Sequence, residues 1–434
     1  MTQSRVSQTE FVALVAMLFA TIAISIDAML PALPEIAATL SPEAPNAAQL
    51  VVTSFVLGMG IGTLFTGPLS DAFGRKRVIL VGSGLYALCA LACYFAPSLE
   101  ILLAARLCQG LAAAAPRTVS IAMVRDLYSG REMARIMSFA MMIFTIVPAI
   151  APLMGQGVIA LGGWHSIFLV YILFSALTML WLGLRQPETL PDENRRPLHL
   201  GDLWSGTCEL LTHRIVLVST LLQTLTLAAL FSTLSSLQGI FERQFDRAES
   251  FPLWFAVIAV ASMSGSLLNS RIVMTLGMRR VIQRTYAGVL VLSLVALATL
   301  GSGLLQGNLG FAMQMLWCIG IFSMMGLTMG NLNALAMEPV GHIAGLAASV
   351  ISSAATVGSV ALAIPAGLPT SSLIFSAISR IFTSCPEAMF ISWPTASSKY
   401  PARSNASTMS MTYVKSRVSS PVPVKGSGKP CNAR

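Results

Sequence analysis

Residues 67–77 read GPLSDAFGRKR and follow directly on the second of a series of long apolar runs. Gly67 allows two helices to approach closely and Gly74 allows a tight turn, because glycine has no Cβ. Asp71 can pair with Arg75 four residues later or cap a helix. A simple anchor on the positive side of a membrane would explain the cations of this stretch but not its aspartate and glycines. The stretch therefore indicates a structured loop between two membrane helices.

Composition places the rest of the chain in a membrane as well. Of its 434 residues, 55% are hydrophobic and only 10% are charged, with a mean hydropathy of +0.74. A soluble domain has about 25% charged residues. The apolar residues fall in long blocks, as in membrane helices of roughly 20 residues. We therefore expect an all-α polytopic membrane protein.

The net charge of +9 does not indicate a nucleic-acid partner. Eight of the 27 basic residues follow residue 379, where Glu387 is the one acidic residue, so residues 1–379 carry 19 basic and 17 acidic residues. No basic face for nucleic acid remains in the apolar part of the chain. The seven cysteines are scattered, and the pair Cys89 and Cys93 has no nearby third ligand, so no metal site is predicted.

Hydropathy predicts eleven membrane spans, the first of them a retained helix and not a cleaved signal peptide. The spans are expected at about 11–30, 48–69, 78–96, 99–123, 137–161, 165–184, 215–240, 251–274, 281–305, 309–333 and 343–366. Basic residues cluster after the second, fourth, sixth and eighth spans, and the loops after spans one, three, five and nine have none. Because basic loops stay in the cytoplasm, the N-terminus is predicted to be cytoplasmic, in a multi-pass protein of the bacterial inner membrane.

The spans divide into two groups around a polar stretch. We expect an N-terminal six-helix half at 1–184, a cytoplasmic central loop at 185–214, a C-terminal half with five clear spans at 215–366, and an anomalous polar, basic tail at 367–434. The sequence GRKR after span two is echoed by GMRR at 277–280 after span eight. Such an echo is typical of the internal repeats of secondary transporters.

Two charged residues lie inside the predicted spans near their outer ends. Arg106 is about 10 Å along span four, and Asp27 is about 6 Å below the end of span one. Charges at such depth are costly and usually functional. We expect the two side chains to meet and Asp27 to exchange protons with the outside. Arg106 snorkelling to the interface, and Asp27 capping the segment after Pro31, are the structural alternatives.

Several segments resemble motifs of the major facilitator superfamily. In the loop 67–77, the residues that match the superfamily's cytoplasmic latch are Gly67, Asp71, Gly74, Arg75 and Lys76, while Ala72 replaces its usual basic residue. Segment 102–110 resembles the second motif, whose arginine, here Arg106, is linked to proton transfer. Segment 147–157 resembles the motif of exporters, matched at Pro148, Pro152 and Gly155, with Ala151 and Gln156 in place of usual glycines; without the resemblance it reads as a kinked helix.

Segments 27–34 and 330–345 add a resemblance to the bicyclomycin-resistance-like subgroup of the drug:proton antiporters. The resemblance, which covers about residues 11–360, implies two six-helix halves around a central cavity, with the last helix missing or aberrant here. It implies proton-coupled export of small drug-like molecules by a monomer in the lipid bilayer, driven by the proton gradient without a cofactor. The polar candidates for the cavity wall are Gln109, Gln223, Thr226, Gln314 and Asn331.

Two other interpretations stay open. A proton-driven importer of a small metabolite has the same fold, although the span-five prolines argue against it. An inactive remnant with a frameshifted C-terminus would explain why the tail is rich in Ser, Pro and Lys and has no twelfth span. No loop carries an enzyme motif, so an enzyme is not expected. Arg117, late in span four, does not fit the superfamily pattern, and the sequence suggests only that it snorkels to the cytoplasmic side.

Overall fold

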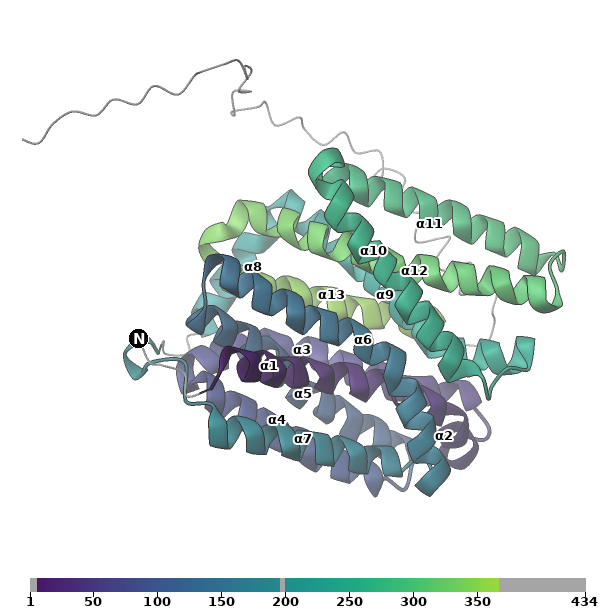
Figure 1. Ribbon diagram of the computed structural model, residues 1–434, viewed down its shortest axis with the longest axis horizontal. Coiled ribbons are helices and arrows are strands. Elements are labelled where there is room, and N and C mark those ends of the chain that lie inside the picture. Colours follow the sequence, from purple (N-terminus) through teal and green to yellow (C-terminus); the bar gives the residue numbers. More distant parts are fainter. Residues whose placement is uncertain (1–5, 196–199, 367–434) are drawn as a thin grey trace, which may run out of the picture. The chain divides into compact units, whose positions relative to one another are not determined.

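The computed structural model describes residues 6–195 and 200–366, which form helices joined by short connections (Figure 1). The described residues contain no strand, so the predicted all-α class is confirmed. The prediction for the tail 367–434, including its missing twelfth span and its frameshift origin, lies outside the described residues.

Among the described residues eleven helices are long, and each contains most of one predicted span. They are α1 (Gln8–Asp27), α3 (Leu50–Phe73), α4 (Arg75–Tyr94), α5 (Leu99–Leu127), α6 (Gly130–Gly162), α7 (Ser166–Arg185), α9 (Arg214–Phe245), α10 (Phe251–Leu276), α11 (Met278–Gly301), α12 (Gly307–Met337) and α13 (Ala344–Ala366). The short helices are α2 (Leu33–Leu40) and α8 (Leu200–Thr212).

Ten segments of the described chain are helical, long and apolar enough to cross a membrane, and α6 adds a shorter apolar stretch, Ile146–Gly162. Large apolar side chains on α4, α7 and α10 are strongly exposed, among them Leu88 at 63%, Leu180 at 59% and Leu267 at 64%. Helices that expose so much apolar surface need lipid around them. The predicted ninth span, 281–305, is too long, because α11 ends at Gly301 and a turn follows in which Gly303 has a φ of +72°.

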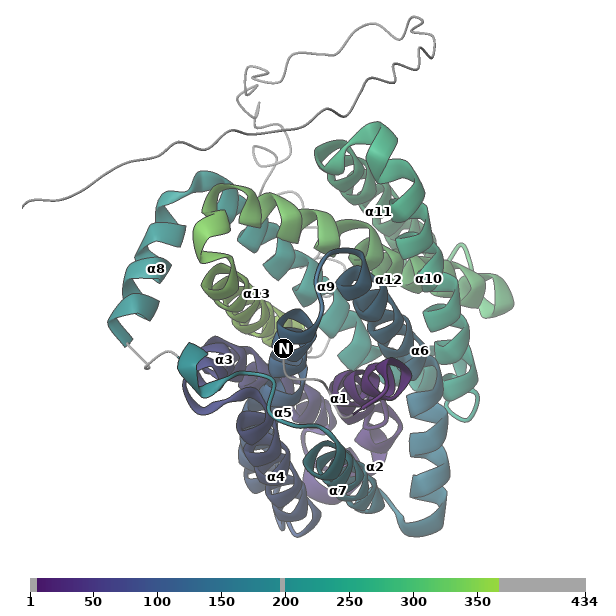
Figure 2. The ribbon, with the colours of Figure 1, turned by 60° about the vertical axis from the view of Figure 1, so that its left-hand side comes forward.

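Close packing of α3 on α5 holds the N-terminal half together. A Cβ on Gly58 would lie 2.0 Å from the carbonyl oxygen of Leu107, and one on Gly110 would lie 2.0 Å from that of Phe55. Small residues at such a crossing let helix backbones touch, which is how helices associate inside a bilayer. Helix α5 also packs on α4, and α4 on α7, as Figures 1 and 2 both show.

Helices from the two parts of the chain also contact one another. Helix α13 packs on both α3 and α9, and α10 packs on α6. Gly67 of α3 approaches α13 closely enough that a Cβ on it would lie 3.2 Å from the Ser349 hydroxyl. The predicted use of Gly67 for close helix approach thus agrees with its position.

The central stretch 185–214, expected as a loop, contains the helix α8. Leu210 of α8 is buried in an apolar cluster with Val216, Ala336, Val340, Ala347 and Ile351. The apolar residues of this segment are too few to predict a membrane span, but they suffice for a short helix that packs against α13 and α9.

The two similar segments 74–77 and 277–280 have the same backbone geometry at their glycines. Gly74 has φ +98° and ψ 150°, and Gly277 has φ +78° and ψ 151°. Each glycine ends one long helix and begins the next. A positive φ is easily adopted only by glycine, which explains why both copies keep it.

Candidate functional site

Arg106 lies at the centre of a hydrogen-bonded cluster in the N-terminal half. Its side chain is fully buried and donates to the carbonyl of Val51 at 3.2 Å, to the amide oxygen of Gln109 at 2.7 Å and to the carbonyl of Ser25 at 2.9 Å. Its guanidinium also stands 4.4 Å from the centre of the Phe55 ring. An arginine inside a membrane is tolerated when its donors are satisfied in this way. Snorkelling to the interface is therefore not its arrangement.

The end of α1 is held by three other helices at Ser25. The Ser25 carbonyl accepts the bond from Arg106 and a second one, at 3.2 Å, from the Tyr171 hydroxyl of α7. The Ser25 hydroxyl and the Tyr86 hydroxyl of α4 lie 2.5 Å apart. These side chains are buried, so the bonds fix the position of the last turn of α1.

Asp27 lies two residues beyond this clamp and is buried, with 6% of its surface exposed. No ion pair within 4.0 Å joins it to Arg106 in the part of the chain that the structure describes. The expected direct meeting of the two side chains is therefore wrong for this conformation. Arg106 instead binds the α1 backbone beside Asp27. The prediction compared only the depths of the two residues along their helices, and depth does not specify in which direction a side chain points.

The exporter-motif helix crosses α1 at the residue next to Asp27. A Cβ on Gly155 of α6 would lie 2.3 Å from the carbonyl oxygen of Ala28. Ala151 and Pro152, one turn earlier, are buried, and Pro148 is half-buried. The structure thus brings this motif to the predicted proton site, an arrangement that the sequence did not indicate.

The latch segment 67–77, expected as a loop, is helical on both sides of Gly74, and it contains a network of charges around Arg75, which is buried. Its guanidinium pairs with Asp71 at 2.5 Å and with Asp126 of α5 at 3.0 Å, and it donates to the Ser70 hydroxyl at 2.6 Å. The predicted pairing of Asp71 with Arg75 is confirmed. Asp126 was not predicted as a partner, although it follows Arg125 at the same end of its helix.

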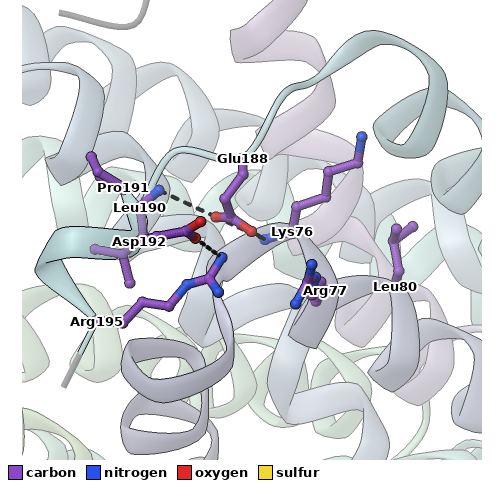
Figure 3. Close-up of a pocket in the computed structure, with 8 residues that line it drawn as sticks. All are labelled: Lys76, Arg77, Leu80, Glu188, Leu190, Pro191, Asp192 and Arg195. Carbon is purple, nitrogen blue, oxygen red and sulfur yellow. Dashed lines mark hydrogen bonds and ion pairs between the residues drawn. The ribbon is translucent and has the colours of Figure 1, made fainter. Parts of the chain in front are cut away.

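Glu188, which the sequence did not indicate, caps the helix α4 that begins directly after Gly74. Its carboxylate accepts a bond from the backbone N–H of Arg75 at 2.8 Å, and it also accepts from the N–H of Thr189. Figure 3 shows its bonds with the backbone N–H of Lys76, at 3.2 Å, and of Leu190. The side chain of Lys76 donates to the carbonyl of Gly183 at 2.8 Å. The three cations at the start of α4 lie at the positive end of the helix dipole, which is unfavourable. In the sequence, these cations are the feature from which an acidic partner could have been predicted.

A pocket of about 510 Å³ opens beside this carboxylate (Figure 3). Its charged lining residues are Lys76, Arg77, Glu188, Asp192 and Arg195. The Arg195 guanidinium pairs with Asp192 at 2.5 Å, as the dashed line in the figure shows. The lining thus comes from the latch and the central stretch, and not from the helix segments around Asp27 and Arg106.

The polar side chains predicted to line a cavity differ in their hydrogen-bond partners. Thr226 of α9 lies 2.6 Å from the Tyr286 hydroxyl of α11, and Asn331 of α12 donates to Asn269 of α10 at 2.8 Å. These two join helices. Gln314 bonds the sulfur of Cys318 on its own helix at 3.6 Å.

Gln109 and Gln223 keep a free donor. Each is almost fully buried, and its side-chain Nε2 has no hydrogen-bond partner in the described part of the chain. A buried amide donor without a partner is costly. Because both side chains are almost fully buried, their predicted place on a cavity wall stays a prediction.

Comparison with known proteins adds to this geometry. The chain is 31% identical over 334 residues to an uncharacterized MFS-type transporter, YdgK, of Bacillus subtilis, which covers 76% of this chain and 81% of that one. It is 34% identical over 256 residues to a bicyclomycin resistance protein homolog of Haemophilus influenzae, covering 58% and 63%. Among solved structures, a D-xylose–proton symporter matches with a TM-score of 0.73 at 12% identity, over 89% of this chain and 97% of that one, and shows the shared fold.

The family model of the Major Facilitator Superfamily matches residues 13–363. That range includes the latch loop, the Arg106 cluster, the glycine crossing beside Asp27 and the repeated glycine turns. The relatives named for drug resistance agree with the drug:proton antiporter resemblance. This chain belongs to the major facilitator superfamily of membrane transporters.

Proposed function

We propose that the protein is a proton-coupled exporter of small drug-like molecules across the bacterial inner membrane, with its N-terminus in the cytoplasm. It acts as a monomer and needs no cofactor beyond the proton gradient. The observation that carries the proposal is the placement of Gly155, on the exporter-motif helix, against the backbone beside the buried carboxyl of Asp27. A resistance-type relative supports the choice of a drug-like substrate.

The mechanism that we propose begins at Asp27, which takes up a proton from the outside. Protonation removes the negative charge of Asp27, two residues beyond the clamp on Ser25, where Arg106 and Tyr171 hold the last turn of α1. The electrostatic interactions of this turn of α1 then change. A resulting movement of α1 would be transmitted to α6 through the contact between Ala28 and Gly155. Helix α6 packs on α10 of the second half, so a shift there moves the halves relative to each other. Proton entry would thus drive the rocking of the two halves that alternating access requires.

The latch lies at the C-terminal end of α3, and it would stabilise one of the two states between which the transporter alternates. Asp71 pairs with Arg75 on the α3–α4 turn, and Gly67 approaches α13 of the second half four residues before Asp71. A charge network next to an interhelical contact can stabilise one arrangement of the helices relative to the other. We therefore expect latch variants to change the balance between the two states and not the binding of the proton.

Everted membrane vesicles test the direction of transport. In such vesicles an exporter accumulates drug when the lumen is acidified, and collapse of the pH gradient releases the drug again. We expect accumulation of at least one member of a panel of neutral, anionic and cationic drugs. Accumulation by whole cells instead would support the importer. No transport in either direction, in a protein that is inserted and folded, would support the inactive remnant.

A further inference from the structure

The pocket beside the start of α4 is lined by more cations than anions. Its basic residues are Lys76, Arg77 and Arg195. Its acidic residues are Glu188 and Asp192, so three positive charges stand against two negative ones and leave a net charge of +1. Both carboxylates already have partners, because Glu188 caps α4 and Asp192 pairs with Arg195. The cavity of about 510 Å³ is many times the roughly 30 Å³ of a water molecule, so it has room for an anion.

The three cations keep hydrogen-bond donors for such an anion. Arg77 is exposed and has no ion pair with another residue of the described chain. Lys76 uses one of the three donors of its ammonium on the Gly183 carbonyl, at 2.8 Å. The Nε of Arg195 is buried and has no hydrogen-bond partner among the described residues, which is costly. An anion beside these side chains would stabilise them in their places.

One wall of the pocket is the segment 188–195, which comes from far along the chain (Figure 3). A Cβ on Gly74 would lie 2.6 Å from a carboxylate oxygen of Glu188 and 3.4 Å from a terminal nitrogen of Arg195. This segment therefore covers the turn from which α4 begins. At the matching turn before α11, a Cβ on Gly277 would have no described neighbour within 4 Å. The two similar turns thus differ in this wall.

The pocket also lies at the edge of the lipid-facing surface. On α4, Arg77 begins a stripe of exposed side chains at intervals of three and four residues. The apolar members of this stripe are Val81, Leu85 and Leu88. On the neighbouring helix α7, Leu184 is strongly exposed directly after Gly183, whose carbonyl binds Lys76. Exposed apolar surface of this kind needs lipid around it, so the cations stand at the level of the lipid headgroups.

We propose that this pocket binds the phosphate group of an anionic membrane lipid. Lys76 and Arg77 would contact the phosphate from α4, and Arg195 would contact it from the central segment. The acyl chains would lie along the exposed stripe of α4 that begins at Arg77. This inference needs only that the helices lie in a membrane, and it does not depend on drug export.

The chemistry of the lining favours an anionic lipid over the other phosphate compounds. Guanidinium groups bind phosphate oxygens through strong, charge-assisted hydrogen bonds, and basic pockets at the ends of membrane helices suit acidic headgroups. A phosphodiester with a single negative charge balances the net charge of +1. A zwitterionic lipid adds a cation that this lining repels. Inorganic phosphate lacks the acyl chains and therefore gains no apolar contact.

Native mass spectrometry of the purified full chain in detergent tests the inference, because it resolves bound lipids and gives their affinities. The probes are dioleoylphosphatidylglycerol, which is anionic, dioleoylphosphatidylcholine, which is zwitterionic, and inorganic phosphate. We expect the wild type to bind phosphatidylglycerol about tenfold more tightly than phosphatidylcholine. Arg77→Gln and Arg195→Gln should each weaken phosphatidylglycerol binding about tenfold and leave phosphatidylcholine binding unchanged. Arg77→Lys should retain part of the preference.

Arg280→Gln provides the matched control. Arg280 occupies the position in the segment 277–280 that corresponds to Arg77, and it is exposed as well, but it does not line the pocket. Its variant should leave both lipid affinities unchanged. Because Arg77 is exposed, Arg77→Gln should stay monodisperse in detergent like the wild type.

Three results would overturn the inference. The first is equal affinity of the wild type for the two lipids. The second is an equal loss of phosphatidylglycerol binding in Arg77→Gln and Arg280→Gln, because the attraction would then belong to any basic surface. The third is displacement of phosphatidylglycerol by an equal concentration of inorganic phosphate, which would assign the pocket to a free phosphate compound.

Discussion

Replacing Glu188 by glutamine removes the charge that caps helix α4 while keeping the size of the side chain. In the wild type one carboxylate oxygen accepts the Arg75 N–H at 2.8 Å and the other accepts the Lys76 N–H at 3.2 Å. Glutamine has a single acceptor oxygen, and its NH₂ group would face a backbone donor. The start of α4 thereby loses one charge-assisted bond and gains a repulsive contact.

The expected cost follows from the bonds that change. A hydrogen bond to a charged group contributes about 1.5–3 kcal/mol, and a carboxylate at a helix N-terminus adds about 0.3–1 kcal/mol. We therefore expect Glu188→Gln to destabilise the protein by about 2 kcal/mol. At roughly 2–4 °C per kcal/mol, the apparent melting temperature should fall by about 4 °C.

A thermal melt of the purified protein in detergent measures this effect, with Asp192→Asn as the control. Asp192 lies four residues further on in the same segment, and its side chain is 84% exposed where it pairs with Arg195. An exposed pair of this kind contributes about 0–1 kcal/mol, so this variant should melt within about 1 °C of the wild type. Equal melting temperatures for the two variants would refute the capping role of Glu188.

Three further predictions use matched pairs or a conservative change. Gly74→Ala should lower the melting temperature more than Gly277→Ala, because both have a positive φ but only at Gly74 would a Cβ meet a carboxylate oxygen, at 2.6 Å; similar losses would contradict this. Gly155→Ala should abolish drug accumulation in vesicles while Gly157→Ala, whose Cβ would have no neighbour within 4 Å, keeps it; retention in both would mean that the crossing is not needed. Arg106→Lys should reduce stability by about 2 kcal/mol, measured by thermal melt, because an ammonium cannot reach all three acceptors, and an unchanged melting temperature would show that the three bonds are not needed.

Much of the fold could be predicted from the sequence because membrane helices are specified by run length and polarity. All eleven predicted spans lie on long helices, and the errors are at the ends, as at 281–305, where hydropathy continues through the turn at Gly303. The helix α8 was missed because its apolar residues are too few for a span. It packs through Leu210 on residues distant in sequence, and these cannot be read from the segment itself.

The candidate site was predicted in part. The ion pair of Asp71 and Arg75 spans four residues on one chain segment, so spacing was enough to find it. The contacts of Glu188 with the start of α4 and of Gly155 with Ala28 join segments more than 100 residues apart. Such contacts depend on how the helices are arranged around one another, and a single sequence contains no direct signal for that arrangement.

Substrate-induced proton release tests the central claim most directly. Everted vesicles that contain the protein are acidified inside, drugs of each charge class are added, and the luminal pH is followed for the wild type and for Asp27→Asn. Asparagine keeps the shape of the side chain and cannot take up a proton. We predict that at least one drug releases protons from wild-type vesicles and that Asp27→Asn loses this release while still binding the drug. Equal proton release by the two proteins would contradict the account.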